Sequence, residues 1–203
     1  MNLPNLLTII RMGLVPVFIV FFYHGLGQQI YLILAFTVFV IASATDAIDG
    51  YIARTRNLIT NFGKLMDPLA DKVLTTAAFI IFVDVNIMPA WMVIVILARE
   101  FVITGLRGVA ASEGVVIAAN LSGKLKTVFQ MAAICFVLLA LAIGVRFRLG
   151  YDTFAVVEGG DLVNGFGAFA AYAGIVLIWV AVVFTVYSGV EYLWKGRKLL
   201  NVK

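Results

Sequence analysis

The chain has 203 residues, of which 63% are hydrophobic and only 13% are charged, and its formal net charge is +4. A soluble domain of this length could not bury so much apolar surface, so the composition predicts an integral membrane protein. The few charged residues and the net positive charge suit contact with anionic headgroups or phosphorylated substrates. A DNA-binding domain is excluded, because it would carry a denser basic face. The single cysteine, Cys135, excludes a disulfide framework.

Six apolar stretches have the length of about 20 residues that a helix needs to cross a bilayer. They cover residues 5–24, 30–53, 64–86, 88–110, 122–147 and 166–194. Short polar or glycine-containing breaks separate the first five, and a longer loop over 148–165 precedes the sixth. No change of composition marks a domain boundary. We therefore expect one domain over 1–203, an all-α integral membrane protein with six transmembrane helices.

Lys and Arg residues are unequally divided between the two sides of this arrangement. Short loops rich in these residues stay in the cytoplasm. If both termini lie on the same side, only Arg146 and Arg148 of the fifteen basic residues fall on the opposite side. The sequence therefore predicts a multi-pass protein of the cell membrane with cytoplasmic N- and C-termini.

Four aspartates fall at the cytoplasmic ends of the second and third predicted spans. Asp46 and Asp49 are three residues apart, and Asp67 and Asp71 are four apart, so each pair lies on one helical face. A charged residue within a span costs roughly 2.5–3.5 kcal/mol on insertion scales and so tends to mark function. Clustered carboxylates repel one another unless cations neutralise them, and all-oxygen ligation suits Mg²⁺ or Mn²⁺. We expect a divalent-metal site here, although each aspartate alone could instead cap a helix or pair with a nearby basic residue.

Small and basic residues accompany these aspartates. Gly50 and Ala53 fall near the acidic face of the second span, where they leave room for a substrate to approach the backbone. Arg54 can pair with a phosphate. Gly63 precedes Asp67 by about one turn, so the second pair also has a small neighbour.

The pattern Asp46-x2-Asp49-Gly50-x2-Ala53-Arg54-x8-Gly63-x3-Asp67-x3-Asp71 resembles, without a gap or substitution, the signature of the CDP-alcohol phosphotransferase family of membrane enzymes. The resemblance implies a six-helix membrane bundle, typically a homodimer. Such enzymes cleave the pyrophosphate of a CDP-linked donor and pass its phosphoryl-bearing part to an alcohol, with release of CMP. The resemblance also implies two divalent cations, Mg or Mn, held by the four aspartates, with Asp71 as the general base. The CDP-donor site would then include Gly50, Ala53, Arg54 and Gly63.

Basic residues of the fourth and fifth spans are candidates for binding the acceptor. Arg99 and Arg107 are eight residues apart, about two helical turns, and share roughly one face, while Lys124 and Lys126 open the fifth span. Phosphate suits such a group, because arginine gives bidentate contacts and lysine a point charge. These residues could instead be cytoplasmic flanking residues that extend to the headgroups, an alternative that applies to Lys126 in particular. Arg11, near the start of the first span, could also face an anion.

Segments 2–11, 98–107, 123–127 and 188–192 are similar to those of the phosphatidylglycerophosphate synthase subfamily. That subfamily transfers the phosphatidyl group of CDP-diacylglycerol to sn-glycerol 3-phosphate in phospholipid biosynthesis. The resemblance implies that Arg99, Arg107 and Lys124 bind the acceptor phosphate.

Other functions stay open at this point. Within the enzyme family, the alternatives are a cardiolipin synthase and a phosphatidylinositol phosphate synthase. From other classes, the alternatives are a metal-ion transporter and an intramembrane aspartyl protease. A transporter is expected to show broken helices or repeated halves near the bilayer midplane, whereas these carboxylates cluster at one interface.

Overall fold

A computed structural model describes residues 3–55, 61–112, 121–148, 156–158 and 165–200. Its main elements are helices that coincide with the six predicted stretches: α1 (Leu3–Gly25), α2 (Gln29–Thr55), α3 (Asn61–Asp84), α4 (Ala90–Ser112), α5 (Leu121–Ala142) and α6 (Phe166–Leu200). A small antiparallel hairpin of β1 (Arg146–Arg148) and β2 (Val156–Glu158) lies between α5 and α6, with Phe147 opposite Val157. The expected helical architecture is therefore confirmed, with a short hairpin added.

Three helices are long and apolar enough to cross a membrane, judged over the described part of the chain. These segments are Thr8–Gly25, Leu121–Ala142 and Phe166–Trp194. In α2 the apolar stretch is shorter, Gln29–Thr45, and it ends where the described side chains of that helix end. The three long apolar segments confirm the expectation of a membrane protein.

The fifth helix is shorter than its apolar run predicts. It ends at Ala142 and not at 147, because Gly144 has a φ of 91° and turns the chain out of the helix. The amide of Val145 then donates to the carbonyl of Ala140 at 3.0 Å, which closes the last turn. The residues that follow form strand β1, so the predicted loop over 148–165 includes one strand of a hairpin and the end of the other.

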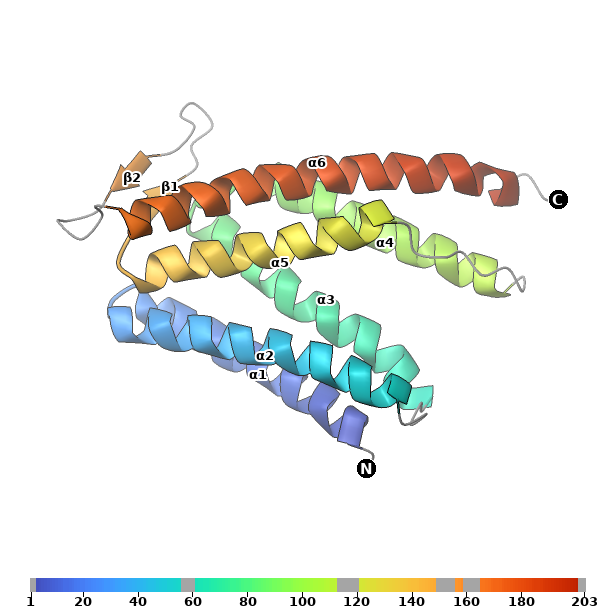
Figure 1. Cartoon of the computed structure of the whole chain (residues 1–203), viewed down its shortest axis with the longest axis horizontal. Coiled ribbons are helices and arrows are strands. Elements are labelled where there is room, and N and C mark those ends of the chain that lie inside the picture. The colour runs from blue at the N-terminus through green and yellow to red at the C-terminus, as the bar shows by residue number, and fades with distance from the viewer. Residues whose placement is uncertain (1–2, 56–60, 113–120, 149–155, 159–164, 201–203) are drawn as a thin grey trace.

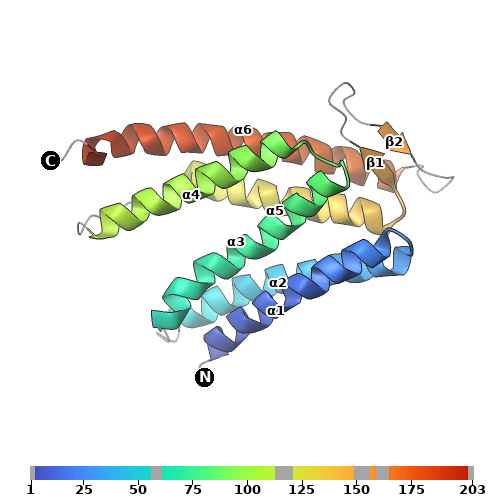
Figure 2. The same cartoon turned by 180° about the vertical axis from the view of Figure 1, so that it is seen from behind.

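The helices form two groups with α3 between them (Figure 1). One group is the pair α1 and α2, and the other contains α4, α5 and α6. Helix α3 starts beside the first pair and crosses obliquely toward the hairpin end, and α4 returns along α6 toward the C-terminus (Figure 2). Helix α5 contacts both α2 and α6, so it joins the two groups on the other side.

Aromatic side chains fill the core between α1, α2 and α3. The rings of Phe18 and Phe39 lie 5.7 Å apart, and those of Phe79 and Phe82 lie 6.5 Å apart, with all four side chains buried. Many large apolar side chains point outward instead, among them Ile94, Val183 and Trp194. An exposed apolar surface of this extent is typical of a protein whose outer solvent is lipid.

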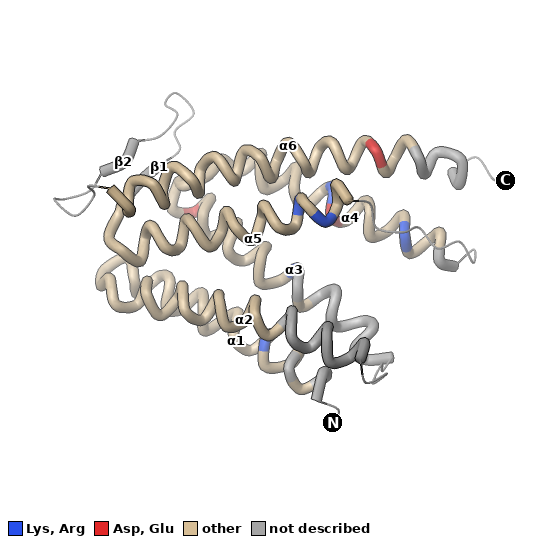
Figure 3. Tube along the Cα trace, in the orientation of Figure 1, with Lys and Arg blue, Asp and Glu red and all other residues tan. Residues whose placement is uncertain are grey.

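Most of the described basic side chains belong to the helices and lie toward the two termini (Figure 3), whereas β1 of the hairpin carries Arg146 and Arg148 in its sequence. At the hairpin end, the Tyr23 hydroxyl donates to Asp84 at 2.8 Å and ties α1 to α3. We call the described basic side chains of the helices the basic region: Arg11, Lys72, Arg99, Arg107, Lys124 and Lys126.

The contact between α5 and α6 depends on a glycine. A Cβ atom at Gly174 would lie 2.9 Å from Val137 Cγ2 and 3.1 Å from the backbone nitrogen of Val137. Backbone atoms cannot move aside as a flexible side chain can, so the two helices would have to separate.

We expect Gly174→Ala to destabilise the protein by about 1–3 kcal/mol, the usual cost of overpacking. The matched control is Gly13→Ala, since a Cβ there meets nothing within 4 Å. Unfolding of both variants in detergent micelles measures the difference. Equal stability of the two variants would contradict the close approach of α5 and α6.

Candidate functional site

The four predicted metal ligands lie on two consecutive helices. Asp46 and Asp49 belong to the C-terminal part of α2, and Asp67 and Asp71 belong to the N-terminal part of α3. Only residues 56–60 connect these two helices. The side chains of the four aspartates lie outside the described residues, so the metal site stays a prediction.

The predicted CDP-donor residues fall in the same two helical segments. They are Gly50, Ala53 and Arg54 of α2 and Gly63 of α3. Their side-chain environments also lie outside the part of the chain that the structure describes. The donor site is therefore a prediction at the level of side chains, as the metal site is.

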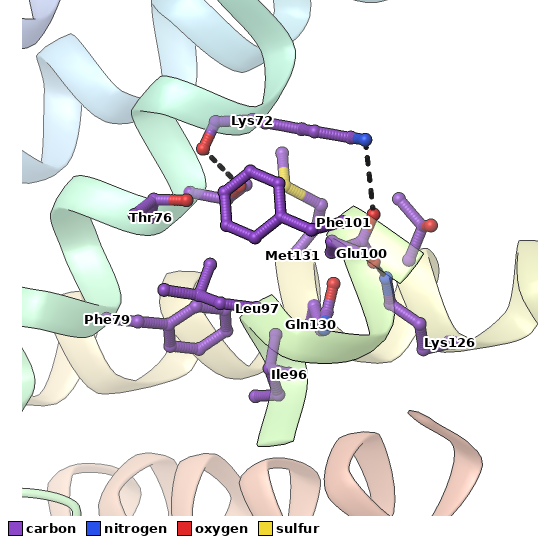
Figure 4. A pocket seen from close by; sticks show the side chains of 12 residues that line it. Lys72, Thr76, Phe79, Ile96, Leu97, Glu100, Phe101, Lys126, Gln130 and Met131 are labelled. Atoms are coloured by element: carbon purple, nitrogen blue, oxygen red, sulfur yellow. Dashed lines mark hydrogen bonds and ion pairs between the residues drawn. The ribbon is translucent and has the colours of Figure 1, made fainter. Parts of the chain in front are cut away.

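Glu100 of α4 is the centre of an ion-pair cluster that joins three helices. Its Oε2 lies 3.7 Å from Lys72 Nζ of α3, and its Oε1 lies 3.5 Å from Arg99 Nη1. Oε1 also pairs with Lys126 Nζ of α5 (Figure 4). Lys72 further donates to the Thr104 hydroxyl one turn along α4. The carboxylate therefore holds α3 and α5 against α4 where Lys72 and Lys126 meet Glu100.

Lys126 does not extend to the headgroups. Its side chain is only 3% exposed, and its ammonium group pairs with Glu100. An ammonium group buried to this extent needs a partner, because its desolvation is otherwise too costly. The alternative that Lys126 is a flanking residue reaching the membrane surface is therefore wrong.

Arg99 lies in a narrow space formed by α5 and α6. Its guanidinium carbon is 5.6 Å from the centroid of the Tyr192 ring, a cation–π geometry. A Cβ at Gly123 would lie 3.4 Å from Arg99 Nη2, and one at Gly189 would lie 3.2 Å from Arg99 Cγ. Larger residues at these two positions would crowd the arginine, so the glycines allow α5 and α6 to close around it.

A second polar contact holds α5 and α6 together beside Arg99. The Ser122 hydroxyl donates to Glu191 Oε2 at 2.6 Å. Ser122 precedes Gly123, and Glu191 precedes Tyr192, so this contact lies next to both residues that surround Arg99. It fixes the relative position of the two helices where they enclose the guanidinium group.

The other predicted acceptor ligands are more accessible. Arg107 and Lys124 are exposed, Arg107 two turns beyond Arg99 on α4 and Lys124 next to Gly123 on α5. The structure therefore brings Arg99 against the segment that carries Lys124, and it places Arg107 on the same helix as Arg99. Arg11, the further anion candidate, is buried in α1 at 1% exposure.

A cavity of about 50 Å³ with a mainly apolar lining lies between α3, α4 and α5 (Figure 4). Three charged residues of the cluster, Lys72, Glu100 and Lys126, form part of its wall. Its other side is apolar and includes Phe79, Leu97 and Met131.

Sequence reasoning assigned no role to two residues of this region. Glu100 is an acidic residue in a segment whose neighbouring charged residues, Arg99 and Arg107, are basic. This opposite charge could have indicated a role for Glu100. Gln130 lines the cavity and follows Lys126 by four residues, so the two share a helical face of α5. A polar pair at this spacing inside an apolar helix could have indicated an internal site.

Residues 1–187 match the family described as CDP-alcohol phosphatidyltransferase. A Bacillus subtilis protein named CDP-diacylglycerol–glycerol-3-phosphate 3-phosphatidyltransferase is 49% identical over 148 residues, which cover 68% of this chain and 77% of the relative. A Mycobacterium tuberculosis protein named probable phosphatidylglycerophosphate synthase is 39% identical over 142 residues, covering 70% of this chain and 68% of the relative. A Cereibacter sphaeroides protein with the same name as the Bacillus relative is 29% identical over 217 residues, covering 98% of this chain and 97% of its own.

We expect Glu100 and Lys126 to be energetically coupled. Glu100→Gln leaves the buried Lys126 without its carboxylate, and the loss of one partner of a buried pair costs about 3–5 kcal/mol. In the double variant Glu100→Gln/Lys126→Met, both charges of the pair are removed. Its destabilisation should therefore be smaller than the sum of the destabilisations by Glu100→Gln and by Lys126→Met. Unfolding free energies of the four proteins in mixed micelles give the coupling. Additive effects would show that this ion pair contributes nothing to the fold.

Proposed function

Because the chain belongs to the CDP-alcohol phosphatidyltransferase family, we infer that it transfers the phosphatidyl group of CDP-diacylglycerol to sn-glycerol 3-phosphate. The products are phosphatidylglycerophosphate and CMP, so the reaction belongs to phospholipid biosynthesis. The observation that carries this conclusion is the similarity to relatives named for this reaction, in Bacillus and Rickettsia among other genera.

The reaction requires a base and a binding site for the acceptor phosphate. An oxygen of the acceptor hydroxyl forms a bond to the phosphatidyl phosphorus, and the bond between that phosphorus and the bridging oxygen of CMP breaks. The hydroxyl proton passes to a base within hydrogen-bond reach. We assign this role to Asp71, which directly precedes Lys72 of the ion-pair cluster on α3.

For the acceptor phosphate we propose Arg99, Arg107 and Lys124. Support for Arg99 comes from its fixed side chain, held over Tyr192 and beside Gly123. Its Nε is buried and has no hydrogen-bond partner among the described residues. A phosphate oxygen would satisfy such a donor, and arginine binds phosphate through paired N–H groups. The exposed side chains of Arg107 and Lys124 are accessible to a soluble acceptor.

We also propose that Asp46, Asp49, Asp67 and Asp71 hold two divalent cations, Mg or Mn. Carboxylate oxygens are the ligands that these hard cations prefer, and the two helices that carry the aspartates are joined by five residues. When bound, the cations supply positive charge that stabilises the pyrophosphate and the leaving nucleotide. Gly50, Ala53, Arg54 and Gly63 would bind the CDP part of the donor beside them.

All six helices span the cell membrane in this proposal, with both termini and the active site on the cytoplasmic side. Support comes from the division of Lys and Arg, since of the fifteen only Arg146 and Arg148 of the hairpin fall on the opposite side of this arrangement. A lipid donor can then keep its acyl chains in the bilayer while glycerol 3-phosphate arrives from water. The homodimer typical of the family is part of the same proposal.

CMP release with different acceptors tests the proposed function. The purified protein in vesicles with CDP-diacylglycerol and Mg²⁺ or Mn²⁺ should release CMP with glycerol 3-phosphate. Release with phosphatidylglycerol alone would identify a cardiolipin synthase, and release with inositol phosphate alone would identify a phosphatidylinositol phosphate synthase. Metal uptake by sealed vesicles without CMP release would identify a transporter.

The role of Asp71 is tested by Asp71→Asn. General base catalysis contributes about 10²–10⁴-fold, so we expect turnover to fall by at least about 100-fold. Binding of CDP-diacylglycerol should persist, which titration of the purified variant with the lipid in detergent would show. Full activity of this variant would remove Asp71 from the role of base.

A further inference from the structure

Gln130 faces the cavity between α3, α4 and α5 (Figure 4). The residue is 6% exposed, and its amide nitrogen Nε2 has no hydrogen-bond partner among the described residues. A buried amide donor without a partner costs free energy of about 1–3 kcal/mol. Such a donor in a cavity wall is therefore a place where an oxygen atom of a ligand would be stabilised.

The cavity has room for a small polar group. A single water needs roughly 10–15 Å³ of such space, and this cavity has about 50 Å³. Its polar wall offers hydrogen-bond donors and one carboxylate acceptor, Glu100, while its other wall is apolar. A hydroxyl group on a short carbon chain fits both walls.

Glu100 gives the cavity wall a hydrogen-bond acceptor. Its carboxylate pairs with Lys72 and Lys126, which line the same cavity, so the wall has donors and an acceptor, as a hydroxyl group requires. A hydroxyl group can donate to the carboxylate. Oε2 of Glu100 meets only Lys72 among the ion pairs of the described residues, whereas Oε1 meets both Arg99 and Lys126. A carboxylate oxygen accepts about two hydrogen bonds, so Oε2 has capacity for another donor.

Two of the helices that line the cavity also carry the proposed base and a proposed phosphate ligand. Thr75 lines it, and Asp71 precedes Thr75 by four residues, so both belong to one face of α3. On the other helix, α4, Glu100 directly follows Arg99. In the proposed function, an acceptor that reaches both Asp71 and Arg99 would extend between these two helices.

We propose that this cavity receives the C2 hydroxyl of glycerol 3-phosphate, with Gln130 donating a hydrogen bond to it and Glu100 accepting one from it. Gln130 is then a residue that determines acceptor specificity. The inference rests on the proposed function and deepens it, since it names the part of the acceptor that the enzyme recognises beside the phosphate. A site built to bind a hydroxyl rejects an analogue that lacks it, because its buried polar groups stay unpaired.

The test compares glycerol 3-phosphate with 3-hydroxypropyl phosphate, which has the same attacking hydroxyl and phosphate but no C2 hydroxyl. The wild-type protein should show a kcat/KM for glycerol 3-phosphate at least about tenfold above that for the analogue. Gln130→Met, which keeps the size of the side chain, should lower kcat/KM for glycerol 3-phosphate by about tenfold. The value for the analogue should change by less than about twofold, because the analogue never used the amide.

Met131→Leu is the matched control. This residue lines the same cavity from the next position of α5, and the substitution conserves volume. The ratio of the two kcat/KM values should stay at the wild-type value. If Gln130→Met does not fold, as judged by its melting temperature in detergent, Gln130→Asn provides the same comparison. The side chain of asparagine is one methylene group shorter, so its amide lies farther from the cavity.

Two results would overturn the inference. One is a wild-type protein that uses both acceptors equally well. The other is an equal loss with both acceptors in the Gln130 variant, which would show that the amide only supports the fold. Failure of the proposed function itself is distinct, because the wild-type protein would then release no CMP with glycerol 3-phosphate.

Discussion

The carboxylate of Glu100 makes the interaction on which the basic region of this protein depends. It attracts Lys72 from α3 and Lys126 from α5, and Arg99 lies beside it on the same helix. These three cations would repel one another if no anion lay between them. Among the described residues this carboxylate pairs with each of the three cations, so the buried ammonium group of Lys126 has a partner within the bundle.

Close packing of helices gives this cluster its geometry. Gly123 and Gly189 let α5 and α6 approach the side chain of Arg99, and Tyr192 covers one face of its guanidinium group. Because burial and neighbours limit its rotamers, Arg99 would lose little further freedom on binding an anion. The same small residues that pack helices in lipid thus hold the side chain of Arg99 in place.

The position of the site at the boundary between lipid and water follows from the nature of the two substrates. Apolar side chains cover the outside of the helices, and the polar residues of the cluster face one another inside the bundle at the end near the termini (Figures 3 and 4). A reaction between a lipid and a water-soluble phosphate requires such a boundary. In the proposed function, the aspartates of α2 and α3 serve the nucleotide of the donor, and the cations of α4 and α5 serve the acceptor.

The number of helices, the membrane class and the family could all be predicted from the amino-acid sequence. These features depend on local and composition-level properties: apolar stretches of sufficient length, and a motif whose aspartates have fixed spacing. The sequence also predicts Arg99 as an acceptor ligand from its helical spacing to Arg107, and this stays a prediction. The arrangement of Glu100, Lys126 and Gln130 around one cavity follows from the fold and not from the sequence. Their partners and the cavity wall come from α3, α4 and α5, which are far apart in sequence, and helical periodicity does not say which faces of separate helices meet. The early end of α5 also depended on the left-handed backbone at Gly144, a conformation that an apolar pattern does not reveal.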